Sequence, residues 1–284
     1  MASMNIESLP FVVQACGRFS PAQVHVAYDP TPRRTTPSLE SAIAEHWDRQ
    51  VELAKGTQRV LFNGEMLRYV RHRVSEAAGS SRFEMTVGPT CYRDFVGTNL
   101  YGQRWLDEVG WECFSNPVGT TATLISSDGL ICYGRRSGRV AYHANHVHTF
   151  GGALEMGDRS ANGTVDVFAS LCRELREELA LAPDELDNLA CVGLIRDKEI
   201  HQPELLFEAR LKMSAAGLRE RWKSADARDE HEEIVTLADH PDAIVPFIQS
   251  CGAIAPVAIG ALFIHGRLAW SEEWSEATKG RIRR

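Results

Sequence analysis

Apolar residues recur at helical spacing in one stretch near the middle of the chain. Between residues 165 and 179 they are separated by three, four, three and four positions, as Val165, Phe168, Cys172, Leu175 and Leu179. This spacing places them on one stripe of an amphipathic helix. Thr164 is expected to cap the helix at its start, and Pro183 is expected to stop its growth.

Shorter apolar runs on both sides of this helix predict strands. Strands are expected at 11–13, 24–28, 59–62, 66–74, 82–87, 121–126, 130–135, 140–148, 190–196, 204–212 and 234–237, with a loop at 75–81. Further helices are expected at 39–54, 103–108 and 215–222, and in segments that begin at Pro246 and Pro256. Strands that alternate with a few helices suit a mixed sheet between helical layers, so the predicted class is α/β (α+β).

Residues 116–119, Asn-Pro-Val-Gly, interrupt the pattern and predict a domain junction. We expect a smaller, β-rich N-terminal domain at 1–116 and a second domain at 117–284. A chain of 284 residues is long enough for two such units, each with its own core.

Composition and charge narrow the class of partner. The chain is 44% hydrophobic and 24% charged, as is usual for a soluble globular protein. A net charge of −7 argues against a nucleic-acid backbone as the main partner. The seven cysteines are scattered without a C-x-x-C pair, which favours reduced thiols and a cytoplasmic location. The most apolar late stretch, 253–264, is too short to span a bilayer, so no membrane partner is expected.

Three carboxylates fall outside the apolar stripe of the central helix. Glu174, Glu177 and Glu178 share one helix face, where each pair of like charges costs about 0.2–0.5 kcal/mol. Together with the glycine loop at 151–152 they form an oxygen-rich set that suits Mg²⁺ or Mn²⁺. The alternative is a solvated charged face, but the glycine loop beside the carboxylates favours the metal site.

The same stretch resembles the Nudix box, G-x5-E-x7-R-E-U-x-E-E-x-G-U, in which U is aliphatic. Residues 173–179, Arg-Glu-Leu-Arg-Glu-Glu-Leu, match its second half, and Leu181 closes it. Gly152, five residues and an acid match its first half. The chain departs from the pattern in three places: the loop acid is Asp158, the residue before Leu181 is Ala180, and the spacer is longer by seven residues.

This resemblance implies the Nudix α/β/α sandwich and a metal-dependent pyrophosphohydrolase. By the same resemblance, Glu174 and Glu178 are expected to bind the metal, followed by Glu177, and the Gly151 carbonyl completes the shell. Arg173 is expected to hold a carboxylate in place. Asp158 is expected to brace the loop.

A second resemblance narrows the substrate. The segment 88–99 (GPTCYRDFVGTN), the HTFGG sequence at 148–152 and the lengthened spacer are similar to the Nudix subfamily that hydrolyses UDP-glucose and UDP-galactose. The similarity extends over most of the chain. It implies a small-molecule nucleotide substrate, a UDP-sugar, that is cleaved to UMP and a sugar 1-phosphate.

The segment 92–99 supplies candidate substrate-binding residues. Tyr92 and Phe95 can flank a uracil ring, and Asn99 can hydrogen bond to its amide edge. Arg93 can bind phosphate. The alternative is an Arg93–Asp94 ion pair in a structural loop whose aromatic rings lie in the core.

Two weaker signals come from the strands around the hairpin at 121–135. Arg135, Arg136 and Arg139 form a basic tip, of which Arg135 is the expected phosphate contact; a solvated turn is the alternative. His146 and His148 share one strand face, and His148 is expected to hydrogen bond beside the substrate rather than bind metal.

The acidic run at 229–233 offers a late carboxylate. Glu232 best matches the His-Glu pair of the UDP-sugar subfamily, as a catalytic base or metal ligand, although a solvated acidic loop is the alternative. Two other functions stay open. One is hydrolysis of a different nucleoside diphosphate derivative, ADP-linked or related to coenzyme A. The other is a non-catalytic Nudix module that senses a nucleotide.

Overall fold

The computed structural model describes residues 9–57, 61–77, 80–140 and 142–282, and it confirms the α/β class. Its centre is a mixed eight-stranded sheet in the order β1-β9-β10-β5-β6-β11, with β7 beside β6 and β8 beside β5. The strands are β1 Phe11–Phe19, β5 Gly119–Ile125, β6 Leu130–Arg136, β7 Val147–His148, β8 Phe150–Ala153, β9 Leu186–Asp197, β10 Pro203–Leu211 and β11 His231–Ala238. Only β10 and β5 are parallel neighbours.

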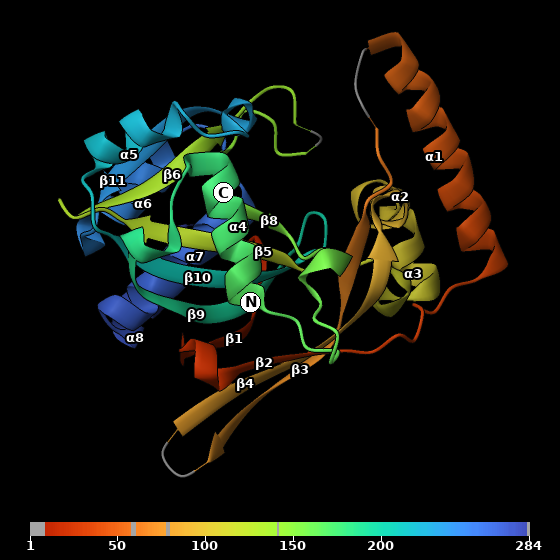
Figure 1. Cartoon of the computed structure of the whole chain (residues 1–284), viewed down its shortest axis with the longest axis horizontal. Helices are drawn as coiled ribbons and strands as arrows, with labels where there is room; N and C mark the ends of the chain where they lie inside the picture. The colour runs from red at the N-terminus through yellow and green to blue at the C-terminus, as the bar shows by residue number, and fades with distance from the viewer. Residues whose placement is uncertain (1–8, 58–60, 78–79, 141, 283–284) are drawn as a thin grey trace, which may run out of the picture.

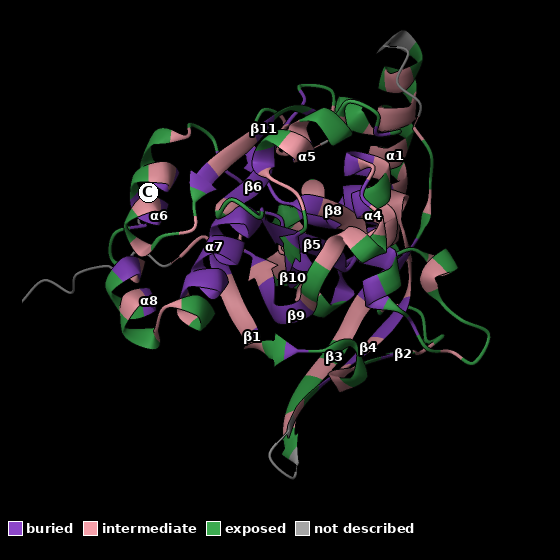
Figure 2. Cartoon of the chain, turned by 60° about the vertical axis from the view of Figure 1, so that its left-hand side comes forward, coloured by how far each residue is buried: buried purple, intermediate pink, exposed green. Residues whose placement is uncertain are grey.

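Helices cover both faces of this sheet (Figure 1). On one face lie α4 (Val167–Leu179) and α5 (Ala215–Trp222); on the other lie α6 (Pro241–Ser250), α7 (Pro256–Ala269) and α8 (Glu272–Lys279). Successive strand residues point to opposite faces, so Leu124 packs in the core under α4 and Ile125 in the core under α7. Figure 2 shows α7 as an almost wholly buried helix. Among the described residues, none of the helices is both long and apolar enough to cross a membrane.

The N-terminal part of the chain forms a second sheet, in the order β2-β4-β3, which contacts the main sheet. Its strands are β2 Val24–Tyr28, β3 Glu65–Ala77 and β4 Ser80–Cys91, and α1 Pro37–Thr57, α2 Tyr92–Phe95 and α3 Leu106–Val109 pack beside it (Figure 1). The Leu67 N–H donates to the Leu154 carbonyl at 2.8 Å, and the Val118 N–H donates to the Leu67 carbonyl at 2.9 Å. Phe83 of β4 and Leu175 of α4 share one core cluster. The boundary at residues 116–117 stays a prediction.

The seven extra residues before α4 contact the N-terminal sheet. The Tyr28 N–H donates to the Gly163 carbonyl at 2.8 Å, and the Val165 N–H donates to the Val26 carbonyl at 2.9 Å. The Arg159 guanidinium lies 4.6 Å from the centre of the Tyr28 ring. The lengthened loop therefore extends the pairing of β2 and fixes the start of α4 against it.

Several predicted boundaries are wrong for identifiable reasons. Of the expected loop at 75–81, residues 75–77 and 80–81 instead continue β3 and β4, and residues 78–79 lie outside the described residues. Of the expected strand at 140–148, residue 141 is likewise outside them, and among the rest only Val147–His148 forms a strand, because positive φ angles at His143 and Asn145 turn the chain. Of the strand expected at 59–62, residues 59–60 lie outside the described residues, and 61–62 are not in a strand.

Three helix details also differ. Asp166, not Thr164, caps α4, because its carboxylate accepts from the Phe168 and Ala169 N–H groups. Leu171, not Cys172, completes the buried stripe of that helix. Pro246 lies inside α6, whose first turn begins at Pro241.

Candidate active site

The glycine loop of β8 lies directly against the carboxylates of α4. The Glu178 side chain is 3% exposed, and its Oε2 accepts a hydrogen bond from the Gly151 N–H at 2.9 Å. A Cβ at position 152 would lie 2.5 Å from the Glu174 carboxyl group. Gly151 adopts φ +141°, where a Cβ would lie 2.0 Å from the Thr120 carbonyl oxygen. Gly152 is therefore needed for α4 to approach the loop this closely, and Gly151 is needed for β8 to pack against β5.

Arg173 ties this helix to the loop that precedes it. Its Nη1 lies 2.7 Å from Glu174 Oε1 and 3.7 Å from Glu177 Oε2, and its Nη2 lies 3.4 Å from Asp158 Oδ2. The same Asp158 oxygen accepts from the Ser170 hydroxyl at 2.9 Å. Asp158 therefore contacts two residues of α4, and its role as a brace of the loop stays a prediction.

The carboxylates of α4 carry more negative charge than Arg173 compensates. Burial raises the pKa of Glu174 to about 7, opposed by Arg173 and reinforced by the charges of Glu178 and Glu177. The burial and the like charges that raise this pKa make the ionised cluster costly. A bound cation would lower that cost.

Glu230 is a carboxylate of this site that the sequence analysis missed. Glu230 is exposed as a whole residue, but partial burial of its carboxyl group and the charges of Glu178 and Glu177 raise its pKa, opposed by nearby cations. The predicted Glu232 is also exposed, and its Oε1 accepts from the Gly138 N–H at 3.3 Å. Both residues belong to the acidic run at 229–233, and only the fold brings one of them to α4.

His231 lies between that loop and α4. Its side chain is fully buried, its Nε2 lies 3.5 Å from Glu178 Oε1, and neither ring nitrogen has a hydrogen-bond partner. Gly134 makes room for the ring, because a Cβ there would lie 2.3 Å from His231 Nδ1. The Phe150 ring packs edge-on against it at 4.9 Å.

The donor chemistry of this cluster fits a hard divalent cation. Glu174, Glu177, Glu178 and Glu230 offer oxygen ligands of the kind that Mg²⁺ and Mn²⁺ prefer. Within the described ranges, no three acidic, histidine or cysteine side chains already converge on one metal position. The fit therefore rests on the ligand type and the uncompensated charge, and ion binding requires the carboxylates to turn toward one point.

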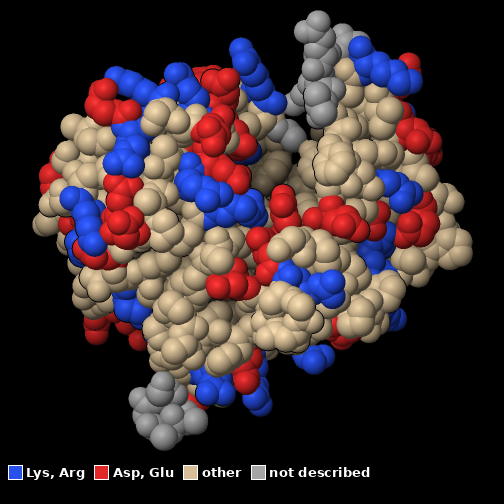
Figure 3. Space-filling view, viewed as in Figure 1, with Lys and Arg blue, Asp and Glu red and all other residues tan. Residues whose placement is uncertain are grey.

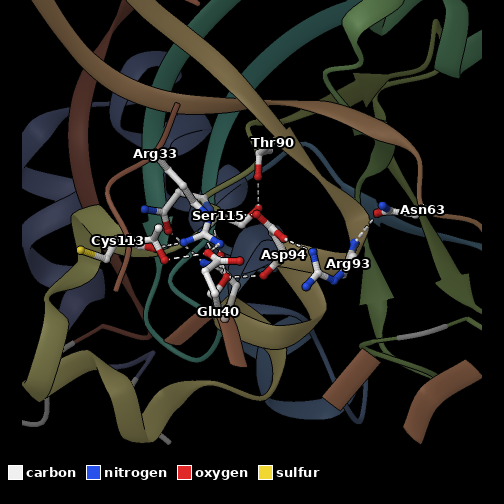
Figure 4. A network of polar contacts seen from close by, with 12 residues as sticks. Arg33, Glu40, Asn63, Thr90, Arg93, Asp94, Cys113 and Ser115 are labelled. Carbon is white, nitrogen blue, oxygen red and sulfur yellow. Dashed lines mark hydrogen bonds and ion pairs between the residues drawn. The ribbon is translucent and has the colours of Figure 1, made fainter. Parts of the chain in front are cut away.

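The predicted Arg93–Asp94 pair lies in a network that attaches α1 to the segment 92–99 (Figure 4). Arg33 Nε donates to Asp94 Oδ2 at 2.9 Å, and its Nη1 donates to the Cys113 carbonyl at 3.1 Å. Arg93 Nη1 lies 3.8 Å from Asp94 Oδ1, while its N–H donates to Asn63 Oδ1 at 2.8 Å. This arrangement favours the structural alternative for Asp94; a substrate contact for either residue stays a prediction.

The three groups expected around uracil lie together but are already engaged. The Asn99 amide is buried, and its Nδ2 donates to Asn116 Oδ1 at 3.0 Å and to the Ile200 carbonyl at 2.9 Å. Phe95 is buried, with the Tyr92 ring centre at 6.2 Å and the Tyr142 ring centre at 5.8 Å. Their role toward a base stays a prediction, and binding would require these contacts to rearrange.

Arg135 and His148 are likewise held by the protein. Arg135 Nε lies 2.6 Å from Glu233 Oε1, and its Nη2 donates to the Cys251 carbonyl at 3.3 Å. His148 is buried with its Nδ1 2.8 Å from the Thr149 carbonyl, and burial holds its pKa well below the usual value, so the ring is neutral. Their roles beside substrate stay predictions.

A cavity of about 460 Å³ opens beside the carboxylate cluster. It is lined by Ser137, Gly138, Arg139, Arg228, Asp229, His231 and Glu232. Its wall includes His231, which contacts Glu178, so the cavity leads toward α4. Figure 3 shows a hollow between α1 and the part of the molecule that holds the main sheet, with charged side chains of both signs along its rim.

Two curated relatives align with most of the chain. Nudix hydrolase 9 of Arabidopsis thaliana is 26% identical over 251 residues, which cover 77% of this chain and 79% of that protein. A Bos taurus protein named uridine diphosphate glucose pyrophosphatase NUDT22 is 24% identical over 274 residues, covering 88% of this chain and 92% of its own. These relatives confirm the resemblance to Nudix hydrolases and support a pyrophosphohydrolase.

The other comparisons add less. No family model matches the chain. The solved structure of DR0079 from Deinococcus radiodurans is similar with a TM-score of 0.36 and 17% identity, over 51% of this chain and 79% of that one. We draw no argument from a structural likeness at this level.

Proposed function

We propose that this protein, which resembles Nudix hydrolases over most of its length, hydrolyses the diphosphate bond of a UDP-sugar to UMP and a sugar 1-phosphate. The observation that carries the proposal is the uncompensated carboxylate cluster of α4, held against Gly151 and Gly152. The name of the Bos taurus relative, which aligns with 88% of this chain, supports the uridine nucleotide.

In this proposal Glu174, Glu177 and Glu178 would hold Mg²⁺ or Mn²⁺. When bound, such an ion neutralises the charge of the diphosphate and lowers the pKa of the attacking water. Arg173 keeps Glu174 oriented through its 2.7 Å contact.

We assign the general base to Glu230 rather than Glu232. Partial burial and the charge of Glu178 raise the pKa of Glu230, and a raised pKa makes its carboxylate a stronger proton acceptor. In the reaction, the water oxygen bonds to phosphorus, the bond from that phosphorus to the bridging oxygen breaks, and the water proton passes to the Glu230 carboxylate. Glu232 instead accepts a hydrogen bond from Gly138 at the cavity rim.

One observation favours a second candidate, hydrolysis of another nucleoside diphosphate derivative. Asn99, the residue expected to hydrogen bond to uracil, already uses its amide on Asn116 and Ile200. The carboxylate cluster would act on the diphosphate whichever base is attached. An ADP-linked compound or coenzyme A is therefore the alternative substrate.

A substrate panel tests both candidates. The purified protein is incubated with Mg²⁺ and UDP-glucose, UDP-galactose, ADP-glucose, ADP-ribose or coenzyme A, and the products are separated by chromatography. We expect UMP and sugar 1-phosphate, with a kcat/KM for the UDP-sugars at least about tenfold above the others, which corresponds to roughly 1.4 kcal/mol. Equal rates would favour the broader class. Binding without turnover, with either Mg²⁺ or Mn²⁺, would favour a nucleotide sensor.

A further inference from the structure

We propose that Arg136 binds a phosphate group of the diphosphate substrate. This inference rests on the proposed function and assigns to the same site a cation that neither the motif nor the relatives assign.

Arg136 is a buried cation without a partner. It is 7% exposed, its Nε has no hydrogen-bond partner, and its guanidinium forms no ion pair with any residue in the described ranges. One face of the guanidinium lies against the Tyr142 ring, with 5.2 Å from Cζ to the ring centre. A buried charge that lacks hydrogen bonds is costly, so a site that keeps one is suited to an anion from outside the chain.

The position of Arg136 places it at the carboxylate cluster. Arg136 of β6 is the cross-strand partner of His231 in β11, and His231 Nε2 lies 3.5 Å from Glu178 Oε1. A diphosphate at this position would meet oxygen ligands and their cation on the α4 side, and a guanidinium on the β6 side.

Arg135 provides the contrast on the same strand. Adjacent strand residues point to opposite faces, so Arg135 and Arg136 enter different surroundings. Arg135 has Glu233, the Asn145 carbonyl and the Cys251 carbonyl as partners. Since those contacts occupy its donors, Arg135 has little left for a ligand, whereas Arg136 has its fork of N–H donors free for two phosphate oxygens.

The test uses Arg136→Gln, Arg136→Lys and the matched control Arg135→Gln in the full chain. Binding of UDP-glucose is measured by isothermal titration calorimetry in EDTA, which separates recognition from turnover. We expect Arg136→Gln to weaken binding by about 10- to 100-fold, since a hydrogen bond to a charged group is worth that factor. Arg136→Lys keeps the charge without the fork, so its affinity should fall between those of the wild type and Arg136→Gln. Arg135→Gln should weaken binding less than Arg136→Gln does, because the donors of Arg135 are already engaged.

Turnover with Mg²⁺ is then measured on the same proteins, with circular dichroism to establish that each is folded. We expect KM to rise in Arg136→Gln more than in Arg135→Gln. The inference is overturned if Arg136→Gln, or Arg136→Lys should the glutamine variant not fold, binds UDP-glucose as tightly as the wild type. It is also overturned if the wild type does not bind. The proposed function fails separately, if the wild type binds UDP-glucose but releases no UMP.

Discussion

Two clusters of charged side chains lie on opposite faces of the main sheet, and they are built differently. On the α7 face, His265 lies between two carboxylates: its Nδ1 is 2.7 Å from Glu208 Oε2 and its Nε2 is 2.8 Å from Asp239 Oδ1. Arg18 forms an ion pair with Glu208, and Arg210 Nη2 lies 3.9 Å from Asp239 Oδ2. On the α4 face, Arg173 lies near three carboxylates, those of Asp158, Glu174 and Glu177.

The titration of the two clusters differs accordingly. Against the effect of burial, hydrogen bonds and charges from Asp239 and Glu208 raise the pKa of His265 to about 9. Burial raises the pKa of an acid, but His265 and Arg18 together lower the pKa of Glu208 below its ordinary value. The hydrogen bond from His265 likewise lowers the pKa of Asp239. In the α4 cluster the pKa of Glu174 is raised instead. A cluster whose charges are matched connects parts of the fold, whereas one with excess charge is suited to a ligand.

The largest effect is expected on turnover, from a change in the α4 cluster, whose charges are not matched. Glu178→Gln keeps an oxygen that accepts from the Gly151 N–H, so the fold should be retained, but it removes a charge from the cluster. We expect kcat on the preferred substrate to fall by about 100- to 1,000-fold, as when a group that stabilises transition-state charge is lost.

Glu220→Gln is the matched control for this loss. Glu220 is an exposed glutamate of α5 paired with Lys223, and its replacement should leave turnover unchanged. Normal turnover in Glu178→Gln, with thermal unfolding like that of the wild type, would remove Glu178 from the catalytic machinery.

On the matched side the expected loss is in stability. His265→Gln leaves Glu208 and Asp239 without the cation between them, and breaking a buried pair in this way costs about 3 kcal/mol. Urea unfolding followed by circular dichroism measures the change in the free energy of unfolding. Turnover per folded molecule should be unaltered. A loss below about 0.5 kcal/mol would show that the α7 cluster contributes little to the fold.

The pH dependence of that loss is set by the histidine. The folded-state pKa of His265, about 9, lies above the unfolded value near 6.5, so folding takes up a proton. Its stabilisation, roughly 3 kcal/mol at most, is complete below about pH 6.5 and is lost as the pH rises through about 9. The lowered pKa values of Glu208 and Asp239 give the opposite trend, lost as the pH falls below about 4.

The free energy of unfolding is therefore compared for wild type and His265→Gln from pH 4 to pH 10. The difference should be largest between roughly pH 5 and pH 6.5 and should shrink toward pH 10. A difference that stays constant between pH 6 and pH 10 would contradict a charged His265.

The smallest effect is expected at Ala180, which belongs to neither cluster. Ala180 ends α4 with φ +55°, a left-handed conformation that costs a residue with a Cβ about 1–2 kcal/mol. Because glycine has more freedom to lose on folding, we expect Ala180→Gly to stabilise the protein by a net of about 0.5–1 kcal/mol. Ala169→Gly, exposed within the same helix, should instead destabilise it by about 1 kcal/mol. Thermal unfolding measures the change in stability of both variants. If Ala180→Gly destabilised the protein, the left-handed conformation of Ala180 would not be strained.

The parts of the site that depend on local sequence could be predicted. The helix and its carboxylate face follow from spacings within one segment, and the structure places Glu174, Glu177 and Asp158 around Arg173. The hairpin at 121–135 could also be predicted from local sequence, because Asp128-Gly129 favours a tight turn.

The parts that depend on distant pairing could not be predicted. Whether Arg135 or Arg136 faces the site is set by the register of β6 against β11, and a shift of one residue would exchange them. The same register brings Glu230, rather than Glu232, toward α4. Asn99 looked free as a base-binding residue because its partners, Asn116 and Ile200, come from segments far along the chain.

The pairing of β1 with β9 has a consequence for how the protein is made. β1 ends at Phe19 and β9 begins at Leu186, so a ribosome must add residues 20–185 before the first strand can find its partner. At about 5–20 residues per second this delay lasts roughly ten to thirty seconds. Throughout it the nascent chain carries an unpaired strand, which is prone to aggregate. Closure of the main sheet is thus an event of late translation, and the order of the strands creates a period in which a chaperone can act.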